Sequence, residues 1–352
     1  MNLRLKKIFT SFDRAGIDAL LVSHAPNVTY LSGFKNNDSW ILISPKGLYF
    51  ITDSRYTEQA RREAKGFTVV ERANKSVTQI VRELADKLRA ARVGYESAVV
   101  THDFYLMLEK NLGADRLVGT RDLTENLRLY KDAAEHRIMK RSADIAVKGF
   151  HHIKKIARAG MTERGLCAEL EYFTKQLGAE KPSFDIIIAT GARASMPHCQ
   201  TGPVKIQNNT VLLVDMGVYY DGYASDLTRP IFLGKISPQL KEIHQIVWDA
   251  QRAGIKKAGP GVPASEVDAA CRDYIRKYGY GDHFGHGTGH GVGLEVHEAP
   301  TVSPRSQTIL KPGMVITVEP GIYLPGKHGI RIEDMLFITD KGSEVLTRDL
   351  DK

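Results

Sequence analysis

Hydrophobic and polar positions in the first third of the chain switch between two spacings. Apolar runs of strand length alternate with segments whose apolar residues recur every three or four positions, as they do on one face of a helix. Pro45-Lys46-Gly47 separates two of the runs as a hairpin turn would, and Pro26-Asn27 predicts a further turn. Strands are predicted at 19–23, 40–44, 48–52 and 93–96, and helices at 3–15, 55–65 and 76–91. This pattern predicts an α/β domain over residues 1–126.

The polar stretch 127–132 predicts the crossing to a second domain, residues 127–352. A long helix with apolar positions at helical spacing is predicted from Ala133 to Ala159, since Gly160 would end it. Thr162-Glu163 predicts the start of the next helix, which would reach about Leu177, and 184–189 reads as a strand.

The strongest strand signal of the second domain ends at a carboxylate. Val211–Val214 is wholly apolar and is followed by Asp215, and after a turn at Asp221-Gly222 the chain returns through Asp226. A hairpin with both acids on one face is the simplest geometry for this pattern. A carboxylate in buried β-structure needs a partner, because burial penalises its charge.

A similar pattern returns near the end of the chain. Residues 314–318 are apolar apart from one threonine, Glu319 follows, and the order acid, any residue, glycine, aliphatic, tyrosine repeats that at Asp215. Glu333 then takes the place of Asp226, which predicts a duplicated hairpin. Four buried carboxylates repel one another, so either they hold protons or cations neutralise them. Two divalent ions carry four positive charges, and an imidazole from the histidine- and glycine-rich stretch 285–298 would complete a ligand set suited to manganese, cobalt, iron or zinc.

These residues and the words around them, VDMGVYYDGYASDLTR, GHGVGLEVHE, TVEPGIY and IRIED, resemble the pita-bread metallopeptidases of the Xaa-Pro aminopeptidase and prolidase branch. The resemblance extends to the first domain through APNVTYLSGF and ITDSRYTEQAR, which are similar to the creatinase and prolidase N-terminal domain. It implies an α/β (α+β) fold in which that domain precedes a pita-bread catalytic domain. The metal ligands that it implies for a dinuclear centre are Asp215, Asp226, His290, Glu319 and Glu333.

The resemblance also assigns residues to the substrate. His198, at the end of a Ser-Met-Pro-His word, and His297 are implied to contact the peptide and stabilise the intermediate, and Glu319 to accept the proton of the attacking water. His286 is expected on the substrate side, against a purely structural role. Tyr323 and Arg331 are expected to orient ligands or substrate, against packing for the tyrosine and a solvated charge for the arginine.

The implied reaction is two-metal hydrolysis of the bond before a proline at the second position of a peptide. A prolidase restricted to dipeptides stays open as an alternative, because nothing in the sequence fixes substrate length. A binding module that has lost catalysis, or a metal-free creatinase, is disfavoured because all five ligands are present. Methionine aminopeptidase shares the ligand set but lacks such an N-terminal domain.

Composition narrows the partners and the compartment. Lysine plus arginine exceeds the acids by 49 to 41, a net charge of +8, yet the basic residues are dispersed in short runs, so we expect no nucleic-acid partner. No apolar run has the length of a signal peptide or a membrane span, and three scattered cysteines fit reduced thiols, so a cytoplasmic protein with no membrane partner is expected. The resemblance adds an expectation of a homodimer, with manganese as the first choice of metal.

Overall fold

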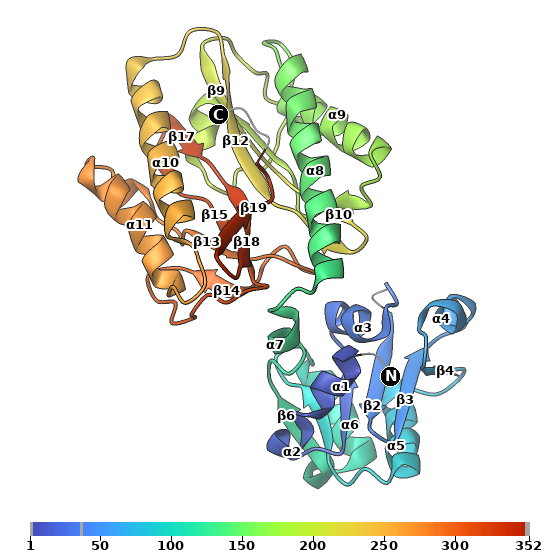
Figure 1. Cartoon of the computed structure of the whole chain (residues 1–352). Helices are drawn as coiled ribbons and strands as arrows, with labels where there is room; N and C mark the ends of the chain where they lie inside the picture. Colours follow the sequence, from blue (N-terminus) through green and yellow to red (C-terminus); the bar gives the residue numbers. More distant parts are fainter. Residues whose placement is uncertain (1–2, 36–37, 349–352) are drawn as a thin grey trace. The chain divides into compact units, whose positions relative to one another are not determined.

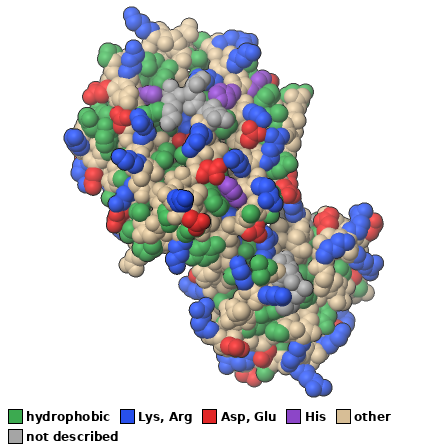
Figure 2. All heavy atoms as spheres, in the orientation of Figure 1, with side chains coloured by type: hydrophobic (Ala, Val, Ile, Leu, Met, Phe, Trp, Pro, Cys, Tyr) green, Lys and Arg blue, Asp and Glu red, His purple; other side chains and the backbone are tan. Residues whose placement is uncertain are grey.

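The structure of the chain is a computed structural model that describes residues 3–35 and 38–348. It forms two compact units that divide between Arg128 and Leu129 (Figure 1). The sequence-based boundary after residue 126 lies two residues before this division. Within the described ranges, no helix is both long enough and apolar enough to cross a membrane. Figure 2 shows lysine and arginine side chains dispersed among acidic ones over the visible face of each unit.

The first unit is built on a six-stranded mixed sheet with strand order β4-β3-β2-β1-β5-β6. Its strands are β1 (Ala19–Val22), β2 (Trp40–Ser44), β3 (Gly47–Thr52), β4 (Thr68–Glu71), β5 (Val93–Glu96) and β6 (Leu117–Thr120). Its helices are α1 (Leu3–Phe9), α2 (Phe12–Ala15), α3 (Ala25–Ser32), α4 (Thr57–Glu63), α5 (Val77–Leu88), α6 (His102–Leu112) and α7 (Glu125–Arg128). Helix α5 packs its apolar face on β2 and β3, which explains its helical spacing.

Two sequence predictions in this unit are wrong. The single helix predicted over 3–15 is two helices, because the chain turns between Phe9 and Phe12. The turn predicted at Pro26-Asn27 is the first turn of α3, where proline is tolerated because the first helical N–H groups have no partner within the helix. Gly33 ends that helix in the left-handed conformation, with φ of 80°.

In the second unit, strands lie between two pairs of helices (Figure 1). The helices are α8 (Ala133–Ile156), α9 (Glu163–Gln176), α10 (Pro238–Lys257) and α11 (Ala264–Lys277). One sheet has the order β12-β9-β8, a second β14-β13-β15-β18-β19, a third β11-β10-β7, and β16 pairs with β17. The strands are β7 (Lys181–Pro182), β8 (Ile187–Thr190), β9 (Thr210–Met216), β10 (Val218–Tyr220), β11 (Tyr223–Ala224), β12 (Leu227–Leu233), β13 (Gly289–Gly291), β14 (Glu298–Val302), β15 (Val315–Val318), β16 (Gly321–Leu324), β17 (His328–Arg331), β18 (Asp334–Thr339) and β19 (Gly342–Val345). The strand predicted at 184–189 thus begins three residues later.

Strand β9 is buried along its whole length, which explains its unbroken apolar run. Val211 and Leu213 pack in the core cluster formed with α10 and α11, and the alternate residues, among them Leu212 and Val214, pack in the cluster formed with α8 and α9. Burial on both faces therefore fixes the path of the strand and brings Asp215, near its end, into the interior.

The duplicated hairpin that the sequence predicts is present. The long strands β9 and β12 pair and their extensions β10 and β11 pair, and the same arrangement recurs in β15 with β18 and β16 with β17. The registers of the two hairpins differ. Asp215 lies opposite Thr228, whereas Val318 lies opposite Asp334, so that the next residues of the second hairpin are Glu319 and Glu333. The two halves thus share a topology but deliver their acids at different ladder positions.

Candidate metal centre

The second unit contains a cavity of about 1010 Å³ lined by acids, histidines and the ends of several strands. All five ligands implied by the sequence line it, although they are up to 118 residues apart (333 minus 215). Asp215 comes from β9, His290 from β13, and the other three from the links that adjoin β12, β15 and β18. The hairpin ends and the glycine-rich stretch therefore meet in one place.

Three of the five ligands offer atoms that all lie within 4.8 Å of one another: Asp226, His290 and Glu333. His290 Nε2 also lies 3.3 Å from Glu319 Oε1 and 3.5 Å from Asp226 Oδ2. Asp215 completes the group as a lining residue of the same cavity. An imidazole nitrogen surrounded by carboxylate oxygens is a donor set that divalent transition metals accept.

His290 is oriented by its own strand. Its Nδ1 lies 3.0 Å from the carbonyl oxygen of Gly291, which can only accept, so Nδ1 carries a proton and Nε2 is the nitrogen that faces the acids. When the ring is protonated, Nε2 can donate to Glu319, and when it is neutral, the lone pair of Nε2 is available to a metal ion. Gly289 allows this close approach of strands, because a Cβ at that position would lie 2.1 Å from the carbonyl oxygen of Thr317. The alternation of glycine and histidine in this stretch thus has a packing reason.

The carboxylates fit cations better than they fit the bare protein. Asp226 and Glu333 are buried, and this burial together with nearby negative charge raises the pKa of both carboxyl groups well above their usual range. Asp215 Oδ1 and Glu333 Oε1 are buried without a hydrogen-bond partner. Burial also raises the pKa of Glu319, but the hydrogen bond and charge of His290 outweigh it and hold that pKa below its usual range. Divalent ions would supply both the missing partners and the missing positive charge.

Arg331 is buried beside the acids, with 4% of its surface exposed, so the alternative of a solvated charge is wrong. Its Nη2 donates to Asp215 Oδ2 at 2.5 Å and its Nε donates to Thr228 Oγ1 at 3.1 Å. Thr228 in turn donates to Glu333 Oε2 at 2.7 Å. Arg331 and Thr228 therefore join a carboxylate of the first hairpin to one of the second.

A chain of hydrogen bonds leads from Arg331 to His286. Arg331 Nη1 donates to the Tyr323 hydroxyl at 2.9 Å, and that hydroxyl lies 2.9 Å from His286 Nε2. His286 Nδ1 donates to the carbonyl oxygen of Gly287 at 2.7 Å, so its Nε2 accepts the tyrosine proton. Burial raises the pKa of Tyr323 to about 12 and lowers that of His286, which keeps both groups neutral at pH 7. Tyr323 is thus a bonded member of the site and not only a packed ring.

The remaining two predicted residues also line the cavity. His198 is exposed and follows the short 3-10 helix Gly191–Ser195. The His297 ring lies 4.3 Å from that of His290, and burial and the neighbouring imidazole lower the pKa of His297. Both histidines are therefore placed where a bound molecule could meet them.

Sequence reasoning missed several residues of the cavity. Thr228 was not singled out, although it stands two residues after Asp226 within a buried strand, where a polar side chain needs a partner. Arg164, Cys167 and Glu171 line the cavity from one face of α9. Their spacing of three and four residues is that of a helix face, but an exposed helix face of this kind carries no signal for a cavity on its own.

Comparison with known proteins agrees with this geometry. Residues 137–340 match metallopeptidase family M24, and residues 4–130 match the creatinase/prolidase N-terminal domain. An Xaa-Pro dipeptidase of Pyrococcus horikoshii is 37% identical over 350 residues, which cover 99% of this chain and 97% of that protein. Among solved structures, an Xaa-Pro dipeptidase from Bacillus anthracis superposes with a TM-score of 0.96 at 41% identity, over 99% of this chain and 98% of that one. An X-Pro aminopeptidase from Thermotoga maritima superposes with a TM-score of 0.90 at 36% identity, over 97% and 99% of the two chains.

The region that matches family M24 contains every residue that lines the cavity. The sequence motifs around the candidate ligands resemble those of the same family. The chain therefore belongs to metallopeptidase family M24, with a creatinase/prolidase N-terminal domain ahead of its catalytic domain.

Proposed function

We propose that the protein is an Xaa-Pro aminopeptidase that removes the first residue of peptides with proline in the second position and uses two divalent metal ions. The observation that carries this proposal is the convergence of Asp226, His290 and Glu333 within 4.8 Å, in a cavity that also takes Asp215 and Glu319. Membership of a metallopeptidase family supports peptide hydrolysis as the reaction, and the group of metal-binding side chains supports this cavity as the active site.

In this proposal Asp226 and Glu333, together with Asp215, His290 and Glu319, would hold the ions. Four carboxylates balance the charge of two divalent ions. Two of their oxygens, Asp215 Oδ1 and Glu333 Oε1, have no hydrogen-bond partner and are therefore available to bind metal. Manganese is our first choice, with cobalt, iron and zinc accepted by the same donors. When bound, such ions lower the pKa of water and polarise a carbonyl group.

The chain's own residues then handle protons and orientation. Glu319, a carboxylate that lines the same cavity, accepts a proton from the attacking water. His297 and His198 face the same cavity and stabilise the negative charge that develops on the carbonyl oxygen. Tyr323 holds His286 in the tautomer described above, which fixes one side of the substrate site.

The arginine and lysine side chains of the cavity decide whether the carboxylate of a dipeptide can be bound there. The free carboxylate of an Xaa-Pro dipeptide lies one residue from the bond that is cut, so a strict dipeptidase needs a free cation close to the metal ligands. Arg331 lies beside the candidate ligands, but it already donates hydrogen bonds to Asp215, Thr228 and Tyr323. Of the described residues that line the cavity, the other arginine or lysine is Arg164, from α9, a helix that carries none of the five candidate ligands. This arrangement favours peptides that continue past the proline.

A prolidase is the second candidate, because the relative from Pyrococcus horikoshii and the structure from Bacillus anthracis both carry the name Xaa-Pro dipeptidase. A homodimer belongs to the same proposal and is supported by the resemblance of the whole chain to this branch of the family.

One set of assays separates these candidates. Purified protein, stripped of metal and then given manganese, is tested on Gly-Pro, on Gly-Pro-Ala and on Gly-Pro-Ala-amide. We expect manganese-dependent cleavage of both longer peptides and weak cleavage of Gly-Pro, and we expect none with the Asp226→Ala, Glu333→Ala double variant. Preference for Gly-Pro would make the protein a prolidase. If bound manganese were demonstrated and none of the three peptides were cleaved, the Xaa-Pro assignment would be wrong and a binding role would remain.

The role of Arg164 is tested in the same way. We propose that Arg164 binds the terminal carboxylate of a tripeptide. Arg164→Gln is therefore expected to raise KM for Gly-Pro-Ala but to leave KM for the amide, which has no terminal carboxylate, and kcat for both unchanged. An equal change for acid and amide would contradict the proposed carboxylate contact.

A further inference from the structure

A second polar cluster lies directly behind the proposed metal centre. We call Arg229, Gln251, Asp334 and Thr347 the Asp334 cluster, and none of the four is more than 3% exposed. Asp334 Oδ1 accepts hydrogen bonds from Arg229 Nη2 and Thr347 Oγ1, both at 2.6 Å, and Asp334 Oδ2 accepts one from Gln251 Nε2 at 2.6 Å. The carboxylate is therefore saturated by three donors from three different segments.

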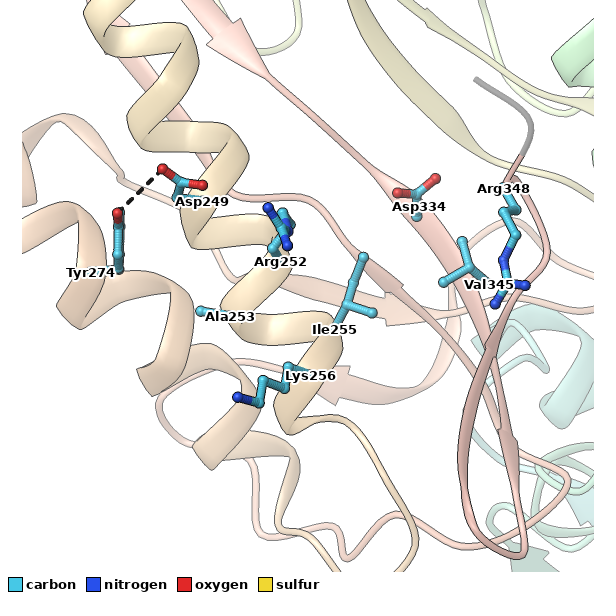
Figure 3. A pocket seen from close by; sticks show the side chains of 9 residues that line it. All are labelled: Asp249, Arg252, Ala253, Ile255, Lys256, Tyr274, Asp334, Val345 and Arg348. Carbon is cyan, nitrogen blue, oxygen red and sulfur yellow. Dashed lines mark hydrogen bonds between the residues drawn. The ribbon is translucent and has the colours of Figure 1, made fainter. Parts of the chain in front are cut away.

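The Asp334 cluster lies on the opposite side of the sheet from the metal ligands. Glu333 and Asp334 are consecutive, and consecutive side chains at a strand point to opposite faces. Glu333 lines the cavity of the metal centre, whereas Asp334 lines a separate cavity of about 640 Å³ formed by residues of α10, α11 and β19 (Figure 3). Asp334 is therefore not placed to bind a metal ion in the cavity of the metal centre, and its three hydrogen bonds must have another role.

Arg229 connects this cluster to the ligand-bearing backbone. Its Nη1 donates to the carbonyl oxygen of Thr228 at 3.0 Å and also to the carbonyl oxygen of Glu333. The backbone N–H of Glu333 donates to the same Thr228 carbonyl at 3.1 Å. One guanidinium group therefore binds both hairpins at the two residues whose side chains form the 2.7 Å contact between Thr228 Oγ1 and Glu333 Oε2.

Stability alone is a weak reason for such an ion pair in a core. Removing two charges from water costs about as much as their attraction returns, and apolar residues of similar volume often replace a buried pair at little or no loss of stability. The hydrogen bonds from Arg229 to two backbone carbonyls instead give the pair a geometric consequence, because they set the spacing of β12 and β18 where the ligands emerge.

We infer that Arg229 and Asp334 are positioning residues, which hold the Glu333 carboxylate and the Thr228 hydroxyl in the geometry that metal binding requires. The inference rests on the proposed metal centre, but it concerns residues that touch neither metal nor substrate. Arg229 acts through its shape as well as its charge, since a guanidinium can direct Nη1 to carbonyl oxygens while Nη2 binds a carboxylate, and an ammonium group on a flexible chain cannot.

The test compares manganese affinity with fold stability. The variant Arg229→Met, Asp334→Leu replaces the pair with apolar side chains. The metal-free protein should still fold, with a lower unfolding midpoint, because Gln251 and Thr347 lose their acceptor. Manganese should bind at least about tenfold more weakly, as is typical when a group that supports a ligand is lost. Titration calorimetry measures the affinity, and electron paramagnetic resonance of the bound manganese reports its surroundings without any assay of activity. Arg229→Lys, which keeps the charge, should show the same loss of affinity.

Two further variants separate positioning from charge and from packing. In Asp334→Asn the amide oxygen can still accept from Arg229 and Thr347, and Gln251 can turn its unpartnered Oε1 toward the new amide group, so manganese affinity should stay within about threefold of wild type. The matched control is Arg193→Lys, because Arg193 also binds a fully buried carboxylate, Glu163, with Nε 3.0 Å from Oε1. That change should leave manganese affinity unaltered.

The inference is overturned if Arg229→Met, Asp334→Leu binds manganese as wild type does, or if Arg193→Lys loses affinity to the same extent. The manganese affinities of the variants and of wild type can be compared whether the site binds one ion or two. A wild-type protein that binds manganese but cleaves no Xaa-Pro peptide would contradict the proposed function, and the affinities would still decide the role of Arg229.

Discussion

Replacement of Thr228 by valine tests how the ligand set is held. Thr228 is completely buried, its Oγ1 donates to Glu333 Oε2 at 2.7 Å, and the same oxygen accepts from Arg331 Nε at 3.1 Å. Valine has nearly the same shape but neither donor nor acceptor. The change therefore removes both bonds with little change in packed volume.

The size of the effect follows from the type of bond. A hydrogen bond to a charged group contributes about 1.5–3 kcal/mol, because the alternative is a buried carboxylate with one partner fewer. If Glu333 needs this bond to keep its carboxylate in place, that energy is lost from metal binding. At 1.4 kcal/mol for each factor of ten, manganese should bind about 10- to 150-fold more weakly to Thr228→Val.

The assay is calorimetric titration of metal-free protein with manganese at pH 7.5, together with a thermal unfolding curve of the same preparation. Thr228→Ser keeps the hydroxyl and loses only a methyl group, so its manganese affinity should remain within about threefold of wild type. Wild-type affinity in the valine variant would refute the reasoning, and so would an equal loss in the serine variant.

Three other changes probe the fold around the site. Gly289→Ala should lower the unfolding midpoint and weaken metal binding, because its Cβ would lie 2.1 Å from a backbone oxygen; a stable variant with wild-type metal affinity would contradict this. Burial first, and then the charge of Glu171, raises the pKa of the Cys167 thiol to about 12, so alkylation by iodoacetamide at pH 8, followed by mass spectrometry, should be at least about 100-fold slower than in the unfolded chain. Glu171→Gln should lower that pKa and speed the alkylation of Cys167. Equal alkylation rates in this variant and in wild type would show that the charge of Glu171 does not act on the thiol. Lys131→Met removes the buried ammonium group that lies 2.5 Å from Glu298 Oε1 and should cost about 3 kcal/mol of stability in thermal unfolding, much of which the double change with Glu298→Gln should restore.

That the five candidate ligands meet in one cavity could be predicted, because their signal in the sequence is local. Asp215 and Glu319 each follow directly on an apolar run, Asp226 and Glu333 stand where the chain returns after a glycine-containing turn, and His290 stands between two glycines. Short motifs therefore identify these residues before their contacts are known. The fold of each unit follows from spacing in the same way. Strand β9 is a clear example, since the apolar run Val211–Val214 is bounded by the turn-like residues 207–209 and by Asp215 and Gly217, and a run of this length favours a strand over a helix.

The supporting contacts could not be predicted, because their partners are distant in sequence. Arg229 and Asp334 are separated by 105 positions, and Gln251 reaches Asp334 from the middle of α10. Nothing near Gln251 distinguishes it from any polar residue of an amphipathic helix. The turn predicted at Pro26 was wrong for a different reason: proline is compatible with both a turn and the first turn of a helix, and packing decides between them.

The contact between Arg331 and Asp215 has a consequence for how the protein is made. The arginine binds Oδ2 of the carboxylate and leaves Oδ1 without a partner, so the two roles of Asp215 do not compete. A newly synthesised chain thus carries part of the counter-charge for its acids within its own sequence. Neutralisation of Asp215 in the folded chain therefore does not depend on a metal ion.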